Sequence, residues 1–317
     1  MKAAVVTSFD SPPRYADFDA PSPAADEILV ATKAAAVTQL ARIFASGKHP
    51  AAGKPPFVPG TDGVGVVEGK RMYFAFPRPP VGSMAELVAV KRRYVVPVPD
   101  DLDDVTAAAT ANPGMAAWSG LTRRARFVRG ESVLVNGAAG TSGRIAVQVA
   151  KYLGARRVVA TARNPDVEGE LRALGADALI VLTQNQAELT EAFKRELRDH
   201  GVDVMLDYLY GNTAEAFLQA CTGPGRGDAE PRVRFVQLGT LAGPNVTLPA
   251  GVLRSSGLEL LGSGLGALSH EELVKGIGEF MAVFRAAGFR IETEAAALRD
   301  VESAWARETS ARVVLTI

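Results

Sequence analysis

The chain has 317 residues, a length that suggests about two domains, and its 35 basic side chains balance 35 acidic ones. This zero formal charge argues against nucleic acid or an anionic membrane as a partner. One cysteine, Cys221, and three histidines without metal-ligand spacing exclude a disulfide framework and a cysteine-rich zinc site. No apolar run has the length of a signal peptide or a membrane span, so we predict a cytoplasmic protein.

The first third of the chain carries short runs of strand-forming residues. They lie at Lys2–Thr7, Glu27–Ala34 and Met84–Val90, with glycine, proline and lysine between them. Short strands with frequent turn signals are typical of an all-β barrel or sandwich. The proline-rich segment His49–Pro59 predicts an extended loop.

A helical pattern follows Pro99. Several aspartates precede the alanine-rich run Val105–Ala111, and acidic side chains suit the start of a helix. The triplet Asn112-Pro113-Gly114 predicts a break in this helix. Residues 115–126 predict a second helix beyond that break.

Strands and helices alternate from Glu131 onward. Ser132–Asn136 predicts a buried parallel strand, and Ile145–Leu153 predicts a helix with one apolar face. The alternation continues to a last strand at Arg234–Leu238, and a strand at Arg312–Ile317 closes the chain. Such alternation predicts an α/β fold with a doubly wound parallel sheet.

A glycine-rich turn separates the first of these strands from its helix, in the segment VLVNGAAGTSGRIAVQV. Glycine at such a turn lets the backbone approach a pyrophosphate and leaves the amides at the helix N-terminus free to bind phosphate. The surrounding strand–turn–helix–strand pattern favours a dinucleotide site over a tight turn without a ligand. The residues that we assign to the cofactor in this turn are Gly137, Ala139, Gly140, Thr141, Ser142 and Gly143.

The end of the next strand indicates which dinucleotide binds. Sites for NAD usually carry an aspartate or glutamate there, which holds the ribose hydroxyls. This chain reads VVATARNP, with Arg163 and Asn164 in place of an acid. An arginine can pair with a 2′-phosphate, whereas a carboxylate would repel it. The pattern favours NADPH; the alternative is that Arg163 only lies at the entry of a helix.

Motifs in a fixed order along nearly the whole chain resemble one enzyme family. They are VPGTDGVGVV at Val58–Val67, VGSMAEL at Val81–Leu87, NPGMAAWSGL at Asn112–Leu121, and the glycine-rich turn with the helix after it. With these motifs the chain resembles the zinc-independent quinone oxidoreductases of the medium-chain dehydrogenase/reductase superfamily.

The resemblance implies a split architecture. A GroES-like β-barrel catalytic domain would comprise residues 1–112 together with a C-terminal return at 255–317. A Rossmann domain that binds NADP would comprise residues 113–254, and the active site would lie in a cleft between the two. Family members are commonly homodimers or homotetramers, so the resemblance also implies a homo-oligomer.

The resemblance further implies that the chain holds no metal. Zinc alcohol dehydrogenases share the fold and carry Gly-His-Glu where this chain has Gly60-Thr61-Asp62, and a cysteine ligand at about the position of Thr38. Without a Lewis acid, an alcohol or aldehyde oxygen is hard to polarise. Reduction of a quinone or an activated C=C bond needs less help because the substrate is already electrophilic.

The implied reaction is hydride transfer from C4 of NADPH to a small electrophilic substrate, a quinone or an α,β-unsaturated carbonyl compound. Thr38 is a candidate hydrogen-bond partner of the nicotinamide ribose or of the substrate oxygen. His49 replaces a family tyrosine and is a candidate proton donor, with an exposed loop histidine as the alternative. The residues implied at the nicotinamide end of the cofactor are Leu238, Gly239, Thr240 and Ser263.

Two other functions stay open from the sequence. The chain departs from the family pattern at several cofactor and substrate positions, which would allow an NADPH-binding protein with little turnover. An enoyl-thioester reductase is the other possibility, and it would need a basic patch for the phosphate of the carrier. The basic cluster Lys91-Arg92-Arg93 gives that reading little support, since such a cluster is more often a solvated turn.

Overall fold

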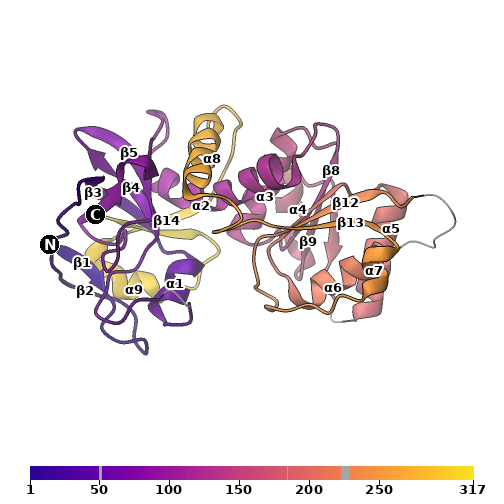
Figure 1. Cartoon of the computed structure of the whole chain (residues 1–317), viewed down its shortest axis with the longest axis horizontal. Helices are drawn as coiled ribbons and strands as arrows, with labels where there is room; N and C mark the ends of the chain where they lie inside the picture. The colour runs from indigo at the N-terminus through magenta and orange to yellow at the C-terminus, as the bar shows by residue number, and fades with distance from the viewer. Residues whose placement is uncertain (50–51, 184, 223–228) are drawn as a thin grey trace. The chain divides into compact units, whose positions relative to one another are not determined.

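The computed structural model describes residues 1–49, 52–183, 185–222 and 229–317, and it divides the chain into two compact units (Figure 1). The first unit comprises Met1–Asn112 and His270–Ile317, and the second comprises Pro113–Ser269. The first boundary lies at the residue expected from the sequence. The C-terminal return to the first unit begins at His270 and not at residue 255, because one further strand belongs to the second unit.

The second unit is built on a six-stranded parallel sheet, which confirms the predicted α/β fold. Its central strands are buried, as parallel strands between two layers of helices are. The strands are β8 (Ser132–Asn136), β9 (Arg157–Ala162), β10 (Ala178–Val181), β11 (Val204–Asp207), β12 (Arg232–Gln237) and β13 (Gly257–Gly262). The helices are α3 (Thr141–Tyr152), η3 (Pro165–Val167), α4 (Glu168–Ala173), α5 (Gln186–Asp199), α6 (Gly211–Ala220) and α7 (Ala250–Arg254).

Strands β8 and β11 lie side by side in this sheet. The order along the sheet is β10-β9-β8-β11-β12-β13, so the chain builds outward from β8 on one side and then outward from β11 on the other. In doubly wound sheets, ligands bind outside the carboxyl ends of the strands at this switch point. The turns that follow Asn136 and Asp207 therefore lie where a ligand is expected.

Strand β13 is missing from the sequence-based expectation, which ends the sheet at β12. The two strands pair along their whole length, from Arg232 opposite Gly257 to Gln237 opposite Gly262. Because β13 is an edge strand, Leu260 remains 44% exposed. Its sequence GLELLG therefore lacks the continuous apolar run by which the buried strands are predicted. This strand places the second domain boundary after Ser269.

Helix α2 (Asp104–Ser119) is continuous, and the predicted break at Asn112-Pro113-Gly114 is wrong. Pro113 lies inside the helix, where its ring removes one backbone hydrogen bond. Buried alanines on both sides of the proline, Ala107 and Ala117 among them, stabilise the continuous form. A π-helix, η2 (Gly120–Ala125), follows and ends at Arg126, whose φ is +50°.

Aromatic side chains fill the core of the second unit. Phe193 of α5 and Phe217 of α6 meet edge-on with ring centroids 5.4 Å apart, and Phe235 of β12 lies 6.3 Å from Phe217. Leu134 and Met205 of the sheet belong to the same buried cluster. The apolar faces of α5 and α6 therefore hold both helices against the sheet.

The first unit contains a strand pair and a mixed seven-stranded sheet. None of the helices in the described residues combines the length and apolar character that crossing a bilayer requires. The strands are β1 (Lys2–Val5), β2 (Arg14–Asp17), β3 (Glu27–Ala36), β4 (Asp62–Val67), β5 (Lys70–Ala75), β6 (Leu87–Lys91), β7 (Val95–Pro97), β14 (Thr293–Ala297) and β15 (Arg312–Thr316). The helices are α1 (Gln39–Ala45), η1 (Arg92–Tyr94), α8 (His270–Val283), η4 (Leu298–Asp300) and α9 (Val301–Trp305).

The seven-stranded sheet runs in the order β14-β15-β3-β4-β5-β7, with β6 also paired to β3. All its pairings are antiparallel except that of β14 with β15. Among the described residues no pairing joins β14 to β7, so the predicted barrel takes the form of a separate, mostly antiparallel sheet. Residues 50 and 51 of the predicted proline-rich loop lie outside the described part of the chain.

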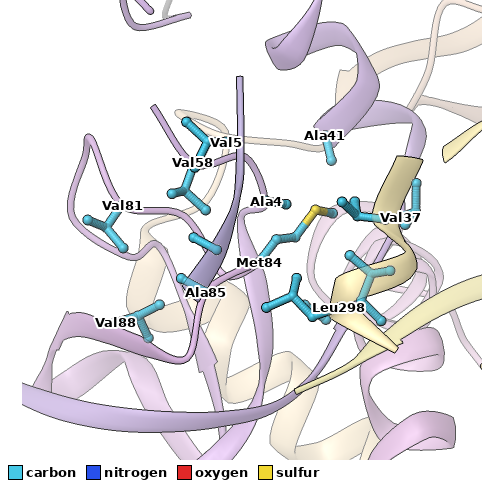
Figure 2. Packing of buried hydrophobic residues seen from close by; sticks show 14 of the residues in the cluster. Ala4, Val5, Val37, Ala41, Val58, Val81, Met84, Ala85, Val88 and Leu298 are labelled. Carbon is cyan, nitrogen blue, oxygen red and sulfur yellow. The ribbon is translucent and has the colours of Figure 1, made fainter. Parts of the chain in front are cut away.

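The core of the first unit joins segments that lie far apart in the sequence. Figure 2 shows Met84 among Ala4 of β1, Val37 after β3 and Leu298 of η4. Ala4, Met84 and Leu298 are each almost fully buried. The C-terminal segment is therefore part of this core, which explains why the chain returns to the first unit after the parallel sheet is complete.

Cys221 caps the C-terminal end of α6 and packs against the core of the second unit. Burial raises the pKa of its thiol to about 12, so little thiolate forms near neutral pH. We expect the native protein to react with a disulfide reagent at pH 8 at least about a hundredfold more slowly than free cysteine. Denatured protein is the control and should react rapidly; equally rapid reaction of native protein would contradict the burial of this thiol.

Candidate active site

The glycine-rich turn joins β8 to α3 at the carboxyl edge of the parallel sheet (Figure 1). Gly137 has a φ of +90°, a backbone conformation that other residues rarely adopt. A Cβ on Gly143 would lie 2.3 Å from the carbonyl oxygen of Gly137 and 2.5 Å from Cα of Ala138. The turn itself therefore requires both glycines, whatever binds beside it.

Gly140 differs from the other two glycines of the motif. Its φ is −77°, and a Cβ would meet nothing nearer than the Gly137 carbonyl oxygen at 3.9 Å. Gly140 is the N-cap of α3, and among the described residues no side chain caps this helix end. Gly140 is also solvent-exposed, and uncapped amides at an exposed helix N-terminus suit an anion such as a pyrophosphate. The neighbouring residues assigned to the cofactor, Ala139, Thr141 and Ser142, are half-buried.

Arg163 and Asn164 follow β9, the strand next to β8, and both side chains are exposed. The amide oxygen of Asn164 accepts the N–H of Asp166 at 3.0 Å and so caps η3. Asn164 can therefore offer a ligand its NH₂ group, while Arg163 offers an exposed guanidinium on the same loop. These donors suit a phosphate better than they suit the hydroxyls of a ribose.

Leu238, Gly239 and Thr240 follow β12, and Ser263 follows β13, at the same carboxyl edge. A Cβ on Gly239 would lie 2.6 Å from the Tyr208 carbonyl oxygen, so the close approach of two backbones requires glycine there. The Ser263 N–H donates to the Gln237 carbonyl oxygen at 3.0 Å. The second unit thus brings together all the residues that the sequence assigns to the cofactor.

Thr38 and His49 lie in the first unit, at the two ends of the segment that contains α1. Thr38 is buried, and its hydroxyl oxygen caps α1 by accepting the Ala41 N–H at 3.0 Å. The hydroxyl proton of Thr38 is still able to donate to a ligand. His49 is half-buried and stacks on Phe44, with ring centroids 4.1 Å apart.

Asp62 is the residue that the family resemblance matches to the glutamate of the zinc enzymes. Thr61 donates its hydroxyl to Oδ1 of Asp62 at 2.7 Å, and Tyr73 donates to Oδ2 at 2.8 Å. Burial raises the pKa of the Asp62 carboxyl, although these two hydroxyls favour its ionised form. Among the described residues, no three histidine, cysteine, aspartate or glutamate side chains gather in a way that could hold a metal ion.

Thr161 belongs to no sequence motif, yet it contacts the glycine-rich turn twice. Its hydroxyl oxygen accepts the Gly137 N–H at 3.0 Å, and its carbonyl oxygen accepts the Ala138 N–H at 2.9 Å. Asn136 and Asp207, which end β8 and β11, are likewise fully buried polar residues. The signal in the sequence is a polar residue at or near the C-terminal end of three strands whose central residues are apolar.

Known proteins resemble the chain in sequence and in structure. Residues 143–282 match the family model described as zinc-binding dehydrogenase. A probable NADPH-dependent quinone reductase of Emericella nidulans is 30% identical, with 99% of each chain covered. A phthioceranic/hydroxyphthioceranic acid synthase of Mycobacterium bovis is 30% identical over 68% of this chain and 10% of that protein. The quinone oxidoreductase of Thermus thermophilus, whose crystal structures include an NADPH complex, superposes with a TM-score of 0.79 at 29% identity over the full length of both chains.

Proposed function

Because the chain belongs to the quinone oxidoreductase type of the medium-chain dehydrogenase/reductase superfamily, we propose that it uses NADPH to reduce a quinone or an α,β-unsaturated carbonyl compound. When bound, NADPH supplies a hydride to the electrophilic carbon or oxygen of the substrate. The observation that carries the proposal is the exposed N-terminus of α3 at Gly140, which no side chain caps among the described residues.

In this proposal, the loops after β8, β9, β12 and β13 each bind a part of the cofactor. The amides of Thr141, Ser142 and Gly143 would donate to the pyrophosphate. The guanidinium of Arg163 would pair with the 2′-phosphate, and the NH₂ group of Asn164 would donate to it. The loops after β12 and β13 would line the nicotinamide end. The residues of those two loops are Leu238, Gly239, Thr240 and Ser263.

The reaction that we propose needs no metal. Thr61 and Tyr73 already donate to both oxygens of Asp62. By the family resemblance, Thr38 lies at about the position at which the zinc enzymes have a cysteine. Thr38 would instead donate its hydroxyl proton to the substrate oxygen or to the nicotinamide ribose. An enone or a quinone is electrophilic enough for hydride addition once the substrate and cofactor are held in line.

The test is oxidation of NADPH, followed by its absorbance, with a panel of quinones and 2-alkenals as acceptors. We expect turnover with at least one acceptor class and the same rate after treatment with a strong chelator. Loss of turnover on chelation would contradict the metal-free reaction. Tight NADPH binding without turnover on any acceptor would instead favour a binding protein.

Replacing Arg163 by alanine is expected to raise the KM for NADPH about tenfold and to leave the KM for NADH unchanged. The reason is that only NADPH carries the 2′-phosphate with which the guanidinium pairs. Arg195→Ala removes another exposed arginine, from α5, and serves as the matched control. Equal changes for the two cofactors in Arg163→Ala would exclude this role.

His49→Phe is expected to lower the kcat for an enone about a hundredfold, because the proton that completes C=C reduction would lose its donor. Phenylalanine keeps a ring that can stack on Phe44, so the loop should retain its conformation. The KM for NADPH serves as the control and should not change. An unchanged kcat would mean that water supplies the proton.

An enoyl thioester is the second candidate substrate, and one observation favours it. The chain is 30% identical to a segment of an acid synthase over 226 residues. Comparison of kcat/KM for an enoyl-CoA with that for a free enone separates the two candidates. A preference for the enoyl-CoA of more than about tenfold would replace the free quinone or enone as the proposed substrate.

A further inference from the structure

A network of buried polar side chains lies directly beneath the glycine-rich turn. Its members come from three adjacent strands and one helix: Asn136 from β8, Thr161 from β9, Asp207 from β11 and Thr213 from α6. The first three are fully buried, and Thr213 is 6% exposed. We call these four residues the switch-point network, because β8 and β11 flank the place where the strand order reverses.

The hydrogen bonds of the network form one continuous chain that leads from Thr161 through Asn136 to Asp207 and Thr213. The Thr161 hydroxyl accepts the Gly137 N–H at 3.0 Å and donates to Oδ1 of Asn136 at 2.7 Å. The Asn136 NH₂ group then donates to Oδ1 of Asp207 at 2.8 Å and to the Thr213 hydroxyl at 3.0 Å. This assignment leaves the Asn136 amide with both its donors and its acceptor in use, so the side chain has one orientation.

The far end of the network holds a second backbone turn. The Asp207 carboxylate accepts the N–H groups of Leu209 and Tyr210 at 3.0 and 3.1 Å. Thr213 donates its hydroxyl to the Tyr210 carbonyl oxygen at 3.1 Å. Tyr210 has a φ of +59°, which is unfavourable for a residue with a large side chain and persists only where surrounding contacts enforce it.

The two turns also touch each other. A Cβ on Gly137 would lie only 2.9 Å from a methyl carbon of Leu209. Gly137 begins the turn at which the pyrophosphate would bind, and Leu209 belongs to the turn after β11. The network therefore fixes both turns at the switch point through a single set of hydrogen bonds.

We propose that the switch-point network positions the glycine-rich turn for NADPH, with Thr161 as the positioning residue that contacts it. This inference rests on the proposed function, since it concerns the same cofactor. Thr161 does not touch the ligand in this account. It holds the Gly137 N–H, and so the path of the backbone into Gly140 and α3, in the conformation that the pyrophosphate needs.

The test compares three variants in a direct titration of NADPH, at a temperature where each is folded. Thr161→Val keeps the shape of the side chain but removes the hydroxyl, and Thr161→Ser keeps the hydroxyl. Ser132→Ala is the matched control. Ser132 begins β8, at the end of the strand opposite Asn136. The Ser132 hydroxyl is also buried, and its one proton can go to the Gly201 carbonyl oxygen or to the Asp203 carboxylate, each 2.9 Å away.

We expect Thr161→Val to raise the Kd for NADPH about tenfold and Thr161→Ser to keep it within about twofold of wild type. Ser132→Ala should lower the thermal midpoint of unfolding while the Kd stays unchanged. A purely structural network would give Thr161→Val and Ser132→Ala the same pattern, and that result would overturn the proposal. An unchanged Kd in Thr161→Val would also overturn it.

A further variant covers the case in which Thr161→Val does not fold. Thr213→Val removes the hydroxyl farthest from the glycine-rich turn and should raise the Kd about threefold, with an unchanged Kd as the contrary result. Wild-type protein that fails to bind NADPH would refute the proposed function itself. Wild-type binding with unaltered Thr161 and Thr213 variants would refute only the role of the network.

Discussion

Gly143→Ala is expected to lower the free energy of unfolding by about 3 kcal/mol and to abolish measurable NADPH binding. The added methyl group would lie 2.3 Å from the Gly137 carbonyl oxygen and 2.5 Å from Cα of Ala138. Both neighbours are backbone atoms, so α3 must move away from the turn to relieve the overlap. Urea denaturation measures the loss of stability, and nucleotide fluorescence measures binding.

Gly169→Ala is the matched control for this variant. Gly169 lies in α4, and a Cβ there would meet no atom within 4 Å. Alanine is also the better helix former, so this variant should be no less stable than wild type. A Gly143→Ala protein as stable as Gly169→Ala would mean that the turn and α3 are not packed as described.

Glu131→Ala is expected to cost about 3 kcal/mol of unfolding free energy, because it leaves the charge of Arg234 buried without its partner. Arg234 lies in β12 and is 2% exposed. Its guanidinium donates to Glu131 and, at 2.7 Å, to the Ala125 carbonyl oxygen at the end of η2. Glu131 also accepts the Val128 N–H at 2.8 Å, so the variant loses a second bond.

The same strand provides the control for this ion pair. Arg232 of β12 pairs with Glu259 of β13 at 2.6 Å, but both side chains are solvent-exposed. Exposed pairs contribute little because water and salt screen them. Glu259→Ala should therefore leave the urea midpoint unchanged. If the two alanine variants lost equal stability, the burial of Arg234 would not be the cause.

The parallel sheet could be predicted from sequence because its central strands are buried on both faces. The mostly apolar composition of Ser132–Asn136 predicts a buried strand, and all its residues are buried. The edge strand β13 carries no such pattern, since Leu260 faces solvent. Pro113 predicts a helix end by local chemistry alone, whereas the buried alanines of α2 keep the helix continuous. Tertiary packing, and not local sequence preference, therefore determines both the edge strand β13 and the continuous helix α2.

The candidate site also has one part that the sequence predicts and one part that it does not. The glycines of the turn are close in sequence, so their spacing alone indicates a phosphate site. The network beneath them joins residues 25 and 71 positions apart, from Asn136 to Thr161 and to Asp207. No local pattern links such residues, because their contact depends on the order of the strands. The capping bond of Thr38 was missed for another reason: α1 has only seven residues and little periodicity.

The central claim is that the exposed N-terminus of α3 at Gly140 holds the pyrophosphate of NADPH, and titration of wild type and Gly140→Ala with NADPH tests it most directly. A Cβ at this position would lie 3.9 Å from its nearest neighbour, so alanine fits without overlap. Because alanine is a poorer N-cap than glycine, the variant should lose up to about 1 kcal/mol of unfolding free energy and remain folded. We predict saturable binding of one NADPH per wild-type chain and at least about tenfold weaker binding by Gly140→Ala. Absence of saturable binding by wild type, or equal affinity of the two proteins, would contradict the account.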